Sequence, residues 1–221
     1  MNISLIVDIV NYSELLSAIA GSIYYFKYKH TVLKYFLFLL WYITITELIG
    51  WYGSVNDVLG FYKDGVSYRT WLYNILRIVT FCSLFYIYFN YLKNNLFKKW
   101  IKLFAIVYII ITILNWSLWQ HFLFERSETP RILGTIFLII TIVFYFIELL
   151  RSDKIVVFYR MLLFWISVGL LLYYSGTLPF VLKWNGYMLI PGAHELFLIV
   201  YILAIIMYLT FTFGFIWSKK E

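Results

Sequence analysis

Three ionisable residues, Glu14, Glu47 and Arg77, lie inside long apolar stretches of the sequence. A charged side chain at the centre of a membrane helix costs about 2.5–3.5 kcal/mol, and such groups face the interior of a helix bundle, where they pair or mark a path for ligands or protons. Glu47 and Arg77 are expected at similar depth on consecutive helices, so we predict that Arg77 is the counter-ion of Glu47. The pair either fixes helix register alone or forms a site where a ligand or proton changes the pairing.

Other polar residues are expected in the same half of the bundle. Asn115 joins the three charged residues as a predicted pocket residue. The peripheral candidates are Asp8, Asn11, Gln120, His121, His194 and Glu195. An alternative for four of these candidates is that they lie only in the membrane–water interface: Asp8, His121, His194 and Glu195. A pocket open to one side suits a receptor, whereas a transporter needs a path on both sides and a channel needs polar residues along its whole length.

Motifs for enzyme chemistry are missing from the sequence. The stretch "HELFL" begins like the zinc-protease motif H-E-x-x-H, but Leu198 occupies the position of the second histidine. No G-x-S-x-G elbow or glycine-rich phosphate loop is present. Glu14 and Glu47 could form a carboxylate pair for acid–base catalysis, but nothing identifies a substrate. We therefore predict no enzyme activity, no metal site and no cofactor.

The composition is typical of an integral membrane protein. Of the 221 residues, 63% are hydrophobic and 13% are charged, against about 25% charged in soluble domains. A spanning helix needs about 20 predominantly apolar residues. The segments that qualify are 4–26, 32–53, 70–92, 101–123, 131–150, 158–182 and 194–217. We predict an all-α integral membrane protein, with residues 1–221 forming one seven-helix transmembrane domain.

The basic residues predict the orientation of this bundle. With the N-terminus outside, 12 Lys and Arg residues fall in inner segments, 5 fall in outer ones and Arg77 lies within a helix, which accounts for all 18. The positive-inside rule therefore favours an N-out, C-in topology. The net charge of +7 does not predict nucleic-acid binding, because the basic residues form short clusters between apolar runs. The lone cysteine, Cys82, allows no intramolecular disulfide.

Two segments of the chain are similar to each other. The stretch "LLWYITITELIGWYGS" (39–54) aligns with "LLFWISVGLLLYYSGT" (162–177) at an offset of 123 residues, which pairs Glu47 with Leu170. Such a parallel repeat would relate helices 1–3 to helices 5–7, with helix 4 as connector. This 3+1+3 arrangement resembles, at fold level only, the SWEET and PQ-loop transporters and the microbial rhodopsins. The Pro-Gln signature is absent, as is a lysine in the last helix.

The stretch "FWISVGLLLYYSGTLPF" resembles small uncharacterised seven-helix membrane proteins of bacteria, some of which accompany sensor kinases. That resemblance implies a multi-pass protein of the bacterial inner membrane. The leading hypothesis is a receptor-like sensor that passes a helix shift to a membrane partner such as a sensor kinase, because its own loops are too short to carry a signalling domain. The alternatives are a small-solute or proton-coupled transporter and a structural or assembly subunit. The expected partners are the lipid bilayer, a membrane signalling partner such as a sensor kinase, and further copies of the chain.

Overall fold

The computed structural model describes residues 3–182 and 194–220, without the side chains of 3, 4, 154 and 194–197. Within this part of the chain the main elements are seven long helices: α1 (Ile3–Ile23), α2 (Lys34–Val55), α3 (Thr70–Tyr91), α4 (Asn95–Leu118), α5 (Glu128–Leu150), α6 (Leu162–Leu182) and α8 (His194–Trp217). All seven are long and apolar enough to cross a membrane. The predicted number of helices and their approximate positions are confirmed.

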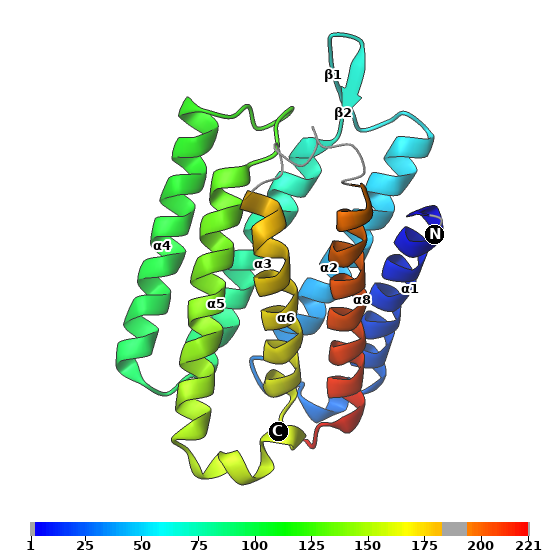
Figure 1. The fold of residues 1–221 in the computed structure, drawn as a ribbon. Coiled ribbons are helices and arrows are strands. Elements are labelled where there is room, and N and C mark those ends of the chain that lie inside the picture. Colours follow the sequence, from blue (N-terminus) through cyan, green and yellow to red (C-terminus); the bar gives the residue numbers. More distant parts are fainter. Residues whose placement is uncertain (1–2, 183–193, 221) are drawn as a thin grey trace.

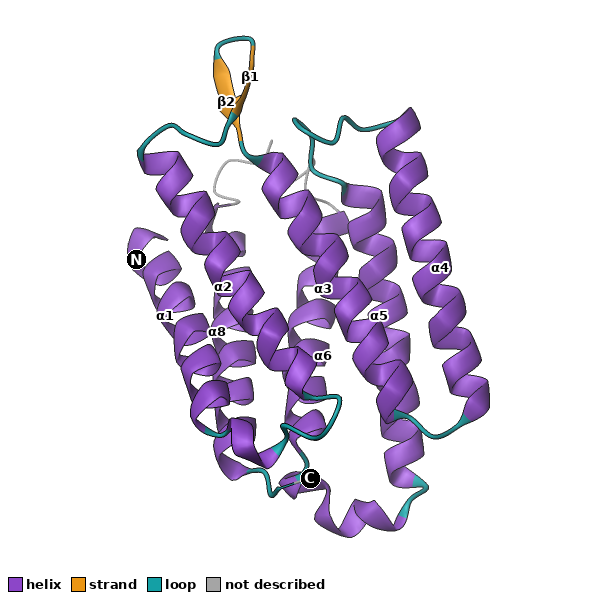
Figure 2. Ribbon diagram, turned by 180° about the vertical axis from the view of Figure 1, so that it is seen from behind, coloured by secondary structure: helices purple, strands orange, loops and turns teal. Residues whose placement is uncertain are grey.

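The helices run along a common direction, and the last helix closes the bundle against the first (Figure 1). Helix α8 packs against both α6 and α1, α2 packs against α1 and α3, and α3 also contacts α4 and α5. A β-hairpin between α2 and α3 projects beyond the helix ends, so we call this end of the bundle the hairpin end and the opposite one the far end (Figure 2). The chain begins towards the hairpin end and finishes at the far end (Figure 1).

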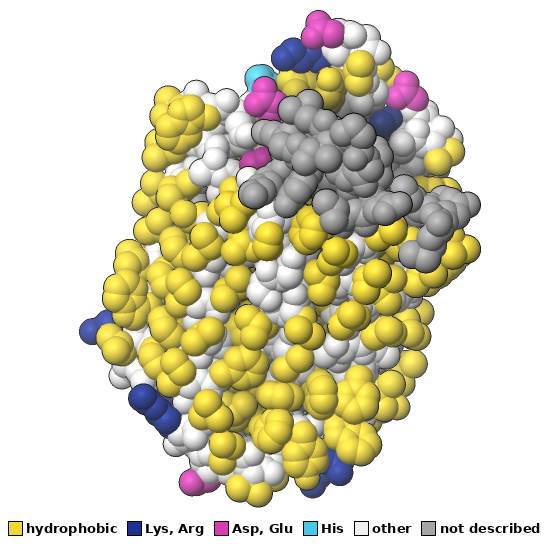
Figure 3. Space-filling view, viewed as in Figure 1, with side chains coloured by type: hydrophobic (Ala, Val, Ile, Leu, Met, Phe, Trp, Pro, Cys, Tyr) yellow, Lys and Arg dark blue, Asp and Glu magenta, His cyan; other side chains and the backbone are white. Residues whose placement is uncertain are grey.

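The surface is mostly apolar between the two ends. In Figure 3 hydrophobic side chains cover the middle of the visible face, and the charged side chains lie towards the two ends. Large aliphatic side chains on different helices are about half exposed: Leu16 at 48%, Ile45 at 50% and Ile110 at 51%. A soluble protein rarely exposes so much contiguous apolar surface, whereas a bilayer solvates it well. The long apolar helices and the apolar surface therefore suggest a membrane protein.

Aromatic side chains fill the bundle near the far end. The rings of Phe36 and Phe211 meet edge to face with centroids 5.0 Å apart, and Phe215 lies 5.5 Å from the ring of Tyr28. The Tyr28 hydroxyl, which is buried, donates a hydrogen bond to the carbonyl of Gly21. Perpendicular and tilted rings at these separations attract one another beyond simple burial, so these aromatic contacts stabilise the bundle here.

The predicted boundaries of two helices are wrong, and for the fourth helix this includes its end, which is at Leu118 rather than 123. The fourth helix begins at Asn95 rather than 101, because the side chain of Asn94 accepts a hydrogen bond from the Leu96 amide at 2.9 Å and caps the helix. The charged cluster Lys98, Lys99 and Lys102 therefore lies in the first turns of α4 and not in a loop. The sixth segment, predicted from 158, instead starts as a 3-10 helix over Asp153–Arg160, and α6 follows at Leu162.

The loop from 55 to 69 contains secondary structure that the hydropathy pattern did not predict. Strands β1 (Phe61–Lys63) and β2 (Val66–Tyr68) pair in antiparallel register. The turn residues Asp64 and Gly65 have φ angles of +52° and +77°. Two consecutive positive φ angles make the type I′ turn that joins two-residue hairpins, and Asp-Gly is a favoured sequence for it.

Candidate functional site

A cavity of about 530 Å³ lies inside the bundle. It follows α3 from Tyr73 to Leu84, which is about 16 Å at 1.5 Å per residue. Helices α1, α2, α3, α5, α6 and α8 contribute to its wall, and among the described residues α4 contributes none. Its size falls in the range of small-molecule pockets. Five of its side chains are acidic or basic residues of the Asp/Glu and Lys/Arg types: Glu14, Glu47, Arg77, Arg126 and Arg131.

Two carboxylates form one side of the cavity. Glu14 on α1 is only 4% exposed, and its Oε1 atom has no hydrogen-bond partner in the described part of the chain. The hydroxyls of Tyr208 and Thr44 lie close to this carboxylate, which also interacts electrostatically with Glu47 on α2. Two carboxylates that line the same cavity repel each other, and a proton or a cation between them relieves that repulsion.

A tyrosine holds the second carboxylate. The Tyr73 hydroxyl donates a hydrogen bond to Glu47 Oε2 at 3.3 Å, across the contact between α2 and α3. The absence of a side chain at Gly50 makes this reach feasible, since a Cβ atom there would lie 2.5 Å from the Tyr73 hydroxyl oxygen. The sequence "ELIG" therefore places the acid one helical turn from the residue that lets its partner approach.

Three arginines form another side of the cavity. Arg77 Nη1 donates to the carbonyl oxygen of Ser127 at 2.8 Å, immediately before α5 begins. Arg126 and Arg131 lie within electrostatic reach of the Arg77 guanidinium, as does Glu128. Arg131 Nη1 is 3.8 Å from a carboxylate oxygen of Glu128, which is a long ion pair. One carboxylate among three guanidinium groups leaves this side positive, and such a cluster favours carboxylate or phosphate.

The direct ion pair predicted between Glu47 and Arg77 is not formed. Within the described residues the ion pairs are Arg69–Asp57 at 3.0 Å and Arg131–Glu128 at 3.8 Å. Arg77 turns towards the start of α5, and the hydroxyl of Tyr73 faces Glu47 instead. Both charged residues nevertheless line the same cavity. Their similar depth on consecutive helices therefore predicted that they lie near each other, but it did not predict which groups they bind.

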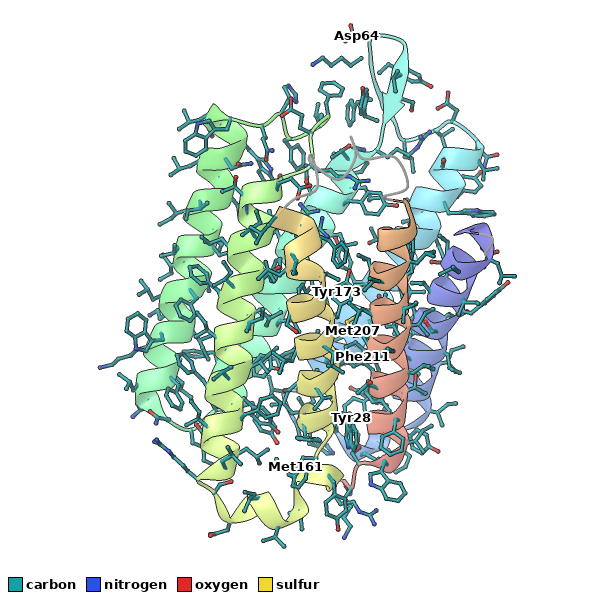
Figure 4. All side chains as sticks on the ribbon, viewed as in Figure 1. Tyr28, Asp64, Met161, Tyr173, Met207 and Phe211 are labelled. Atoms are coloured by element: carbon teal, nitrogen blue, oxygen red, sulfur yellow. The ribbon has the colours of Figure 1, made fainter. Side chains whose placement is uncertain are left out.

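Tyrosines lie between the acidic and basic sides. Tyr173 on α6 interacts electrostatically with Arg131, Arg77 and Glu47, and therefore lies within reach of both sides. Figure 4 shows Tyr173, Met207 and Phe211 in the space between α6 and α8, in that order from the hairpin end. The tyrosines in the cavity wall are Tyr73, Tyr173, Tyr174, Tyr201 and Tyr208.

These tyrosines, and two of the arginines, were not among the predicted site residues. Arg126 and Arg131 were counted as outer loop charges, although both line the cavity. The sequence did offer a signal for these two arginines. Both lie close to the start of a helix, on the side of the bundle where few positive charges are expected. No comparable signal marked the tyrosines, because the chain contains 21 of them.

Asn115 does not belong to the cavity. Its Nδ2 atom donates to Gln120 Oε1 at 2.9 Å, and the same oxygen accepts from the Glu128 amide at 3.2 Å. The carbonyl of Asn115 also accepts from the Gln120 amide at 2.9 Å. These bonds shape the connection between α4 and α5, so the predicted pocket role of Asn115 and the peripheral role of Gln120 are replaced by a structural one.

The remaining candidates divide between the cavity and the surface. Asn11 lines the cavity beside Glu14. Asp8 is exposed on α1 and His121 is exposed in the α4–α5 connection, and neither lines the cavity. The side chains of His194 and Glu195 lie outside the described residues.

Apolar side chains line the cavity where it approaches the far end. Phe36, Phe81 and Phe211 are each 2% exposed and Leu84 is 1% exposed. The charged groups and most of the tyrosines lie nearer the hairpin end, because Arg131 and Arg77 are on the first turns of α5 and α3. The cavity is therefore charged on one part of its length and aromatic on the other.

The fold and the cavity together define a bundle of seven helices that are long and apolar enough to cross a membrane, with charged side chains lining an internal cavity. No protein-family model, curated protein or solved structure matches this chain. Its function is therefore inferred from the cavity itself.

Proposed function

We propose that the protein is a receptor-like sensor of the bacterial inner membrane, with its N-terminus and hairpin end outside. In this proposal the cavity binds a ligand or proton from the outside, and a helix shift passes to a membrane partner such as a sensor kinase. The observation that carries the proposal is the asymmetry of the cavity. Its charged groups lie towards the hairpin end, and buried phenylalanines occupy it towards the far end.

The charge distribution of the chain supports this orientation. The far end carries the Lys98, Lys99 and Lys102 cluster on α4 together with Lys27 and Lys29, and a positive cytoplasmic side is the general rule. The hairpin end then faces outwards, with the arginines of the cavity near that surface. A one-sided polar pocket suits binding, whereas transport requires access from both sides.

A route for the signal exists in the contacts of α8. Lys27, in the connection between α1 and α2, donates from Nζ to the carbonyl oxygens of Phe215, Ile216 and Ser218 at 3.1, 2.7 and 2.9 Å. The Lys219 amide also donates to the carbonyl of Arg160 at 2.9 Å. A ligand that changes the repulsion between the carboxylates on α1 and α2 therefore acts on helices tied to α8 at the far end.

The alternative function is a proton-coupled or small-solute transporter. The buried and unpartnered Oε1 atom of Glu14 favours it, because a carboxylate that exchanges protons inside a membrane has this environment. In that case the phenylalanines at Phe36 and Phe211 must separate during the cycle. The third reading, a structural or assembly subunit, uses the same charged residues for packing alone.

Hydrogen–deuterium exchange of the full chain in nanodiscs tests the sensor. We expect a stimulus, either a small-molecule ligand or a change of external pH, to alter exchange over 153–160 and 24–33 at the far end. Glu47→Gln and Arg77→Ala should abolish this response while the protein still folds and inserts. Glu125→Gln, at an exposed residue outside the cavity, is the matched control. Normal responses in both cavity variants would contradict the sensor mechanism.

Proteoliposomes separate sensing from transport. The transporter reading predicts solute or proton flux that Glu14→Gln slows, whereas the sensor predicts no flux with verified insertion. The structural reading predicts neither flux nor response. It predicts instead that the same substitutions reduce stability or assembly.

A further inference from the structure

We propose that the ligand of the cavity is a small zwitterion, with its ammonium group at Glu14 and Glu47 and its carboxylate or phosphate group at Arg77, Arg126 and Arg131. This inference rests on the proposed function and names the class of ligand that the same site takes. It follows from the two opposite charge clusters that line one cavity and form no ion pair with each other among the described residues.

The acidic side has fewer donors than its two carboxylates can accept, although the Tyr73 hydroxyl donates to Glu47 and the Tyr208 hydroxyl lies close to Glu14. Glu14 lines the cavity. Its Oε1 atom is buried and has no hydrogen-bond partner in the described part of the chain. The nearby Thr44 hydroxyl donates to the carbonyl of Leu40 at 3.0 Å, so its proton is already used. Leaving a buried acceptor unpaired costs about 1–3 kcal/mol, and more for a charged one. An ammonium group supplies three donors and the opposite charge.

A metal ion fits this side less well than an organic cation. Among the described residues no group of three or more His, Cys, Asp or Glu side chains is close enough to hold a metal. The groups around Glu14 and Glu47 are tyrosine and threonine hydroxyls and apolar side chains. Such a wall suits an ammonium group, which needs hydrogen-bond acceptors and also tolerates aromatic rings.

The basic side has surplus donors. Arg77 uses Nη1 on the Ser127 carbonyl, and Arg131 contacts Glu128 only at 3.8 Å. Each guanidinium group carries five N–H donors in a planar fork that matches a carboxylate or phosphate. A bound anion would therefore take up N–H groups of Arg77 and Arg131 that make no hydrogen bond within the described residues, and it would reduce the repulsion among the three guanidinium groups.

A molecule with both charges fits better than one with a single charge. The fixed contacts of Tyr73 with Glu47 and of Arg77 with Ser127 hold the two clusters on different walls. Tyr173 lies within electrostatic reach of both. A simple amine leaves the arginines unneutralised and a simple anion leaves the carboxylates unneutralised, whereas a zwitterion spanning the cavity compensates both.

The volume of about 530 Å³ limits the ligand to a small molecule or the headgroup of a larger one. Free amino acids and phosphoethanolamine carry the required charges, and so does the headgroup of phosphatidylethanolamine. The charged groups that the cavity would recognise are the same in each case, so an experiment must distinguish a free molecule from a lipid headgroup.

Binding to the full-length protein tests the inference. The soluble probes are glycine, 4-aminobutyrate and phosphoethanolamine, compared with ethylamine, acetate and ethyl phosphate, by calorimetry and thermal stability in dodecyl maltoside and in phosphatidylglycerol nanodiscs. We expect at least one zwitterion to bind at least tenfold more tightly than its singly charged analogues. Stabilisation by phosphatidylethanolamine nanodiscs, with weak binding of soluble probes, identifies the headgroup as source. Tight soluble binding unaffected by that lipid identifies a free zwitterion.

Two substitutions test the placement of the charges. Glu14→Gln should weaken zwitterion binding about tenfold and leave the binding of singly charged anions unchanged. Arg131→Gln should also weaken zwitterion binding, but it should leave the binding of simple amines unchanged. Glu125→Gln and Arg151→Gln, both at exposed positions outside the cavity, are the matched controls. Equal binding of a singly charged analogue, no binding in any arm, or equal losses in cavity and control variants would overturn the inference.

The outcomes also separate this inference from the sensor proposal. If a zwitterion binds as expected but does not change exchange at 153–160, the ligand class stands and the sensor mechanism fails. If no zwitterion binds but protons or a singly charged molecule change that exchange, the sensor mechanism stands and the ligand class is wrong.

Discussion

The two halves of the bundle are built from the same helices but are stabilised in different ways. Towards the hairpin end, charged and tyrosine side chains surround a cavity, and Glu14 keeps an unpartnered oxygen. Towards the far end, rings such as Phe36, Phe211 and Phe215 pack against one another, and Lys27 ties the end of α8 to the α1–α2 connection. One half leaves space among charged and polar side chains, and in the other the helices are held together by ring contacts and by the bonds of Lys27.

The largest effect is expected in the far half. Phe215→Ala removes a fully buried ring that packs between Tyr28 and Phe36 and should lower the free energy of unfolding by about 3–5 kcal/mol. Phe213→Ala on the same helix, where the side chain is 44% exposed, is the control and should cost much less. Thermal unfolding monitored by tryptophan fluorescence measures both. Equal losses would show that the far half is not a specially packed core.

A smaller effect is expected at the junction of the far half with α8. Lys27→Met removes the donor to three carbonyl oxygens at the end of α8 and should cost about 1–2 kcal/mol, since charge-assisted bonds and a cation at a helix C-terminus both stabilise. Lys29→Met, at an exposed residue in the same connection, should be nearly neutral. In the sensor, Lys27→Met should also uncouple ligand binding from exchange at 153–160.

In the hairpin half, Glu14→Gln should have the opposite sign. Without ligand, the substitution removes the repulsion with Glu47 and should raise the free energy of unfolding by about 0.5–1 kcal/mol. The free energy of unfolding of both proteins, measured without and with ligand, should show that the variant is more stable only when the ligand is absent. A large destabilisation instead would mean that Glu14 is part of the packing, and the contrast between the two halves would disappear.

The smallest effect concerns the hairpin itself. The Tyr62 hydroxyl, which donates to Asp57 at 2.6 Å, and the Arg69 guanidinium hold the pKa of Asp57 below its usual value of 3.8. A lowered folded-state pKa stabilises the hairpin above pH about 4, and this stabilisation is lost as the pH falls through the lowered value. Amide exchange of 57–69 measured against pH should show the loss, and Asp57→Asn should remove the dependence. An unchanged profile in Asp57→Asn would assign it to another group.

Much of the architecture was predictable from local features of the sequence. Runs of apolar residues gave seven helices because backbone groups in lipid must bond within their own helix. The ends of α4 differ from the prediction because the Asn94 cap and the start of the α4–α5 connection depend on individual side-chain hydrogen bonds, which hydropathy does not contain. The hairpin was missed because short exposed strands leave no apolar run, although Asp64-Gly65 marked its turn.

The site was predictable in part. Glu14, Glu47 and Arg77 were identified because ionisable residues in apolar helices have few acceptable environments, and all three line the cavity. Asn115 was misplaced because its helix stands outside the cavity wall, and depth along a helix does not say which way a side chain faces.

The sequence by itself determined the seven apolar helices and the depth at which its internal charges lie, because both follow from composition along single segments. The tertiary structure alone decided the partners of those charges. Tyr73 meets Glu47, the carbonyl of Ser127 meets Arg77, and Arg131 joins the cavity wall from α5. These choices depend on the rotation and crossing of helices far apart in the chain, where hydrogen bonds and ring contacts between them outweigh any local preference.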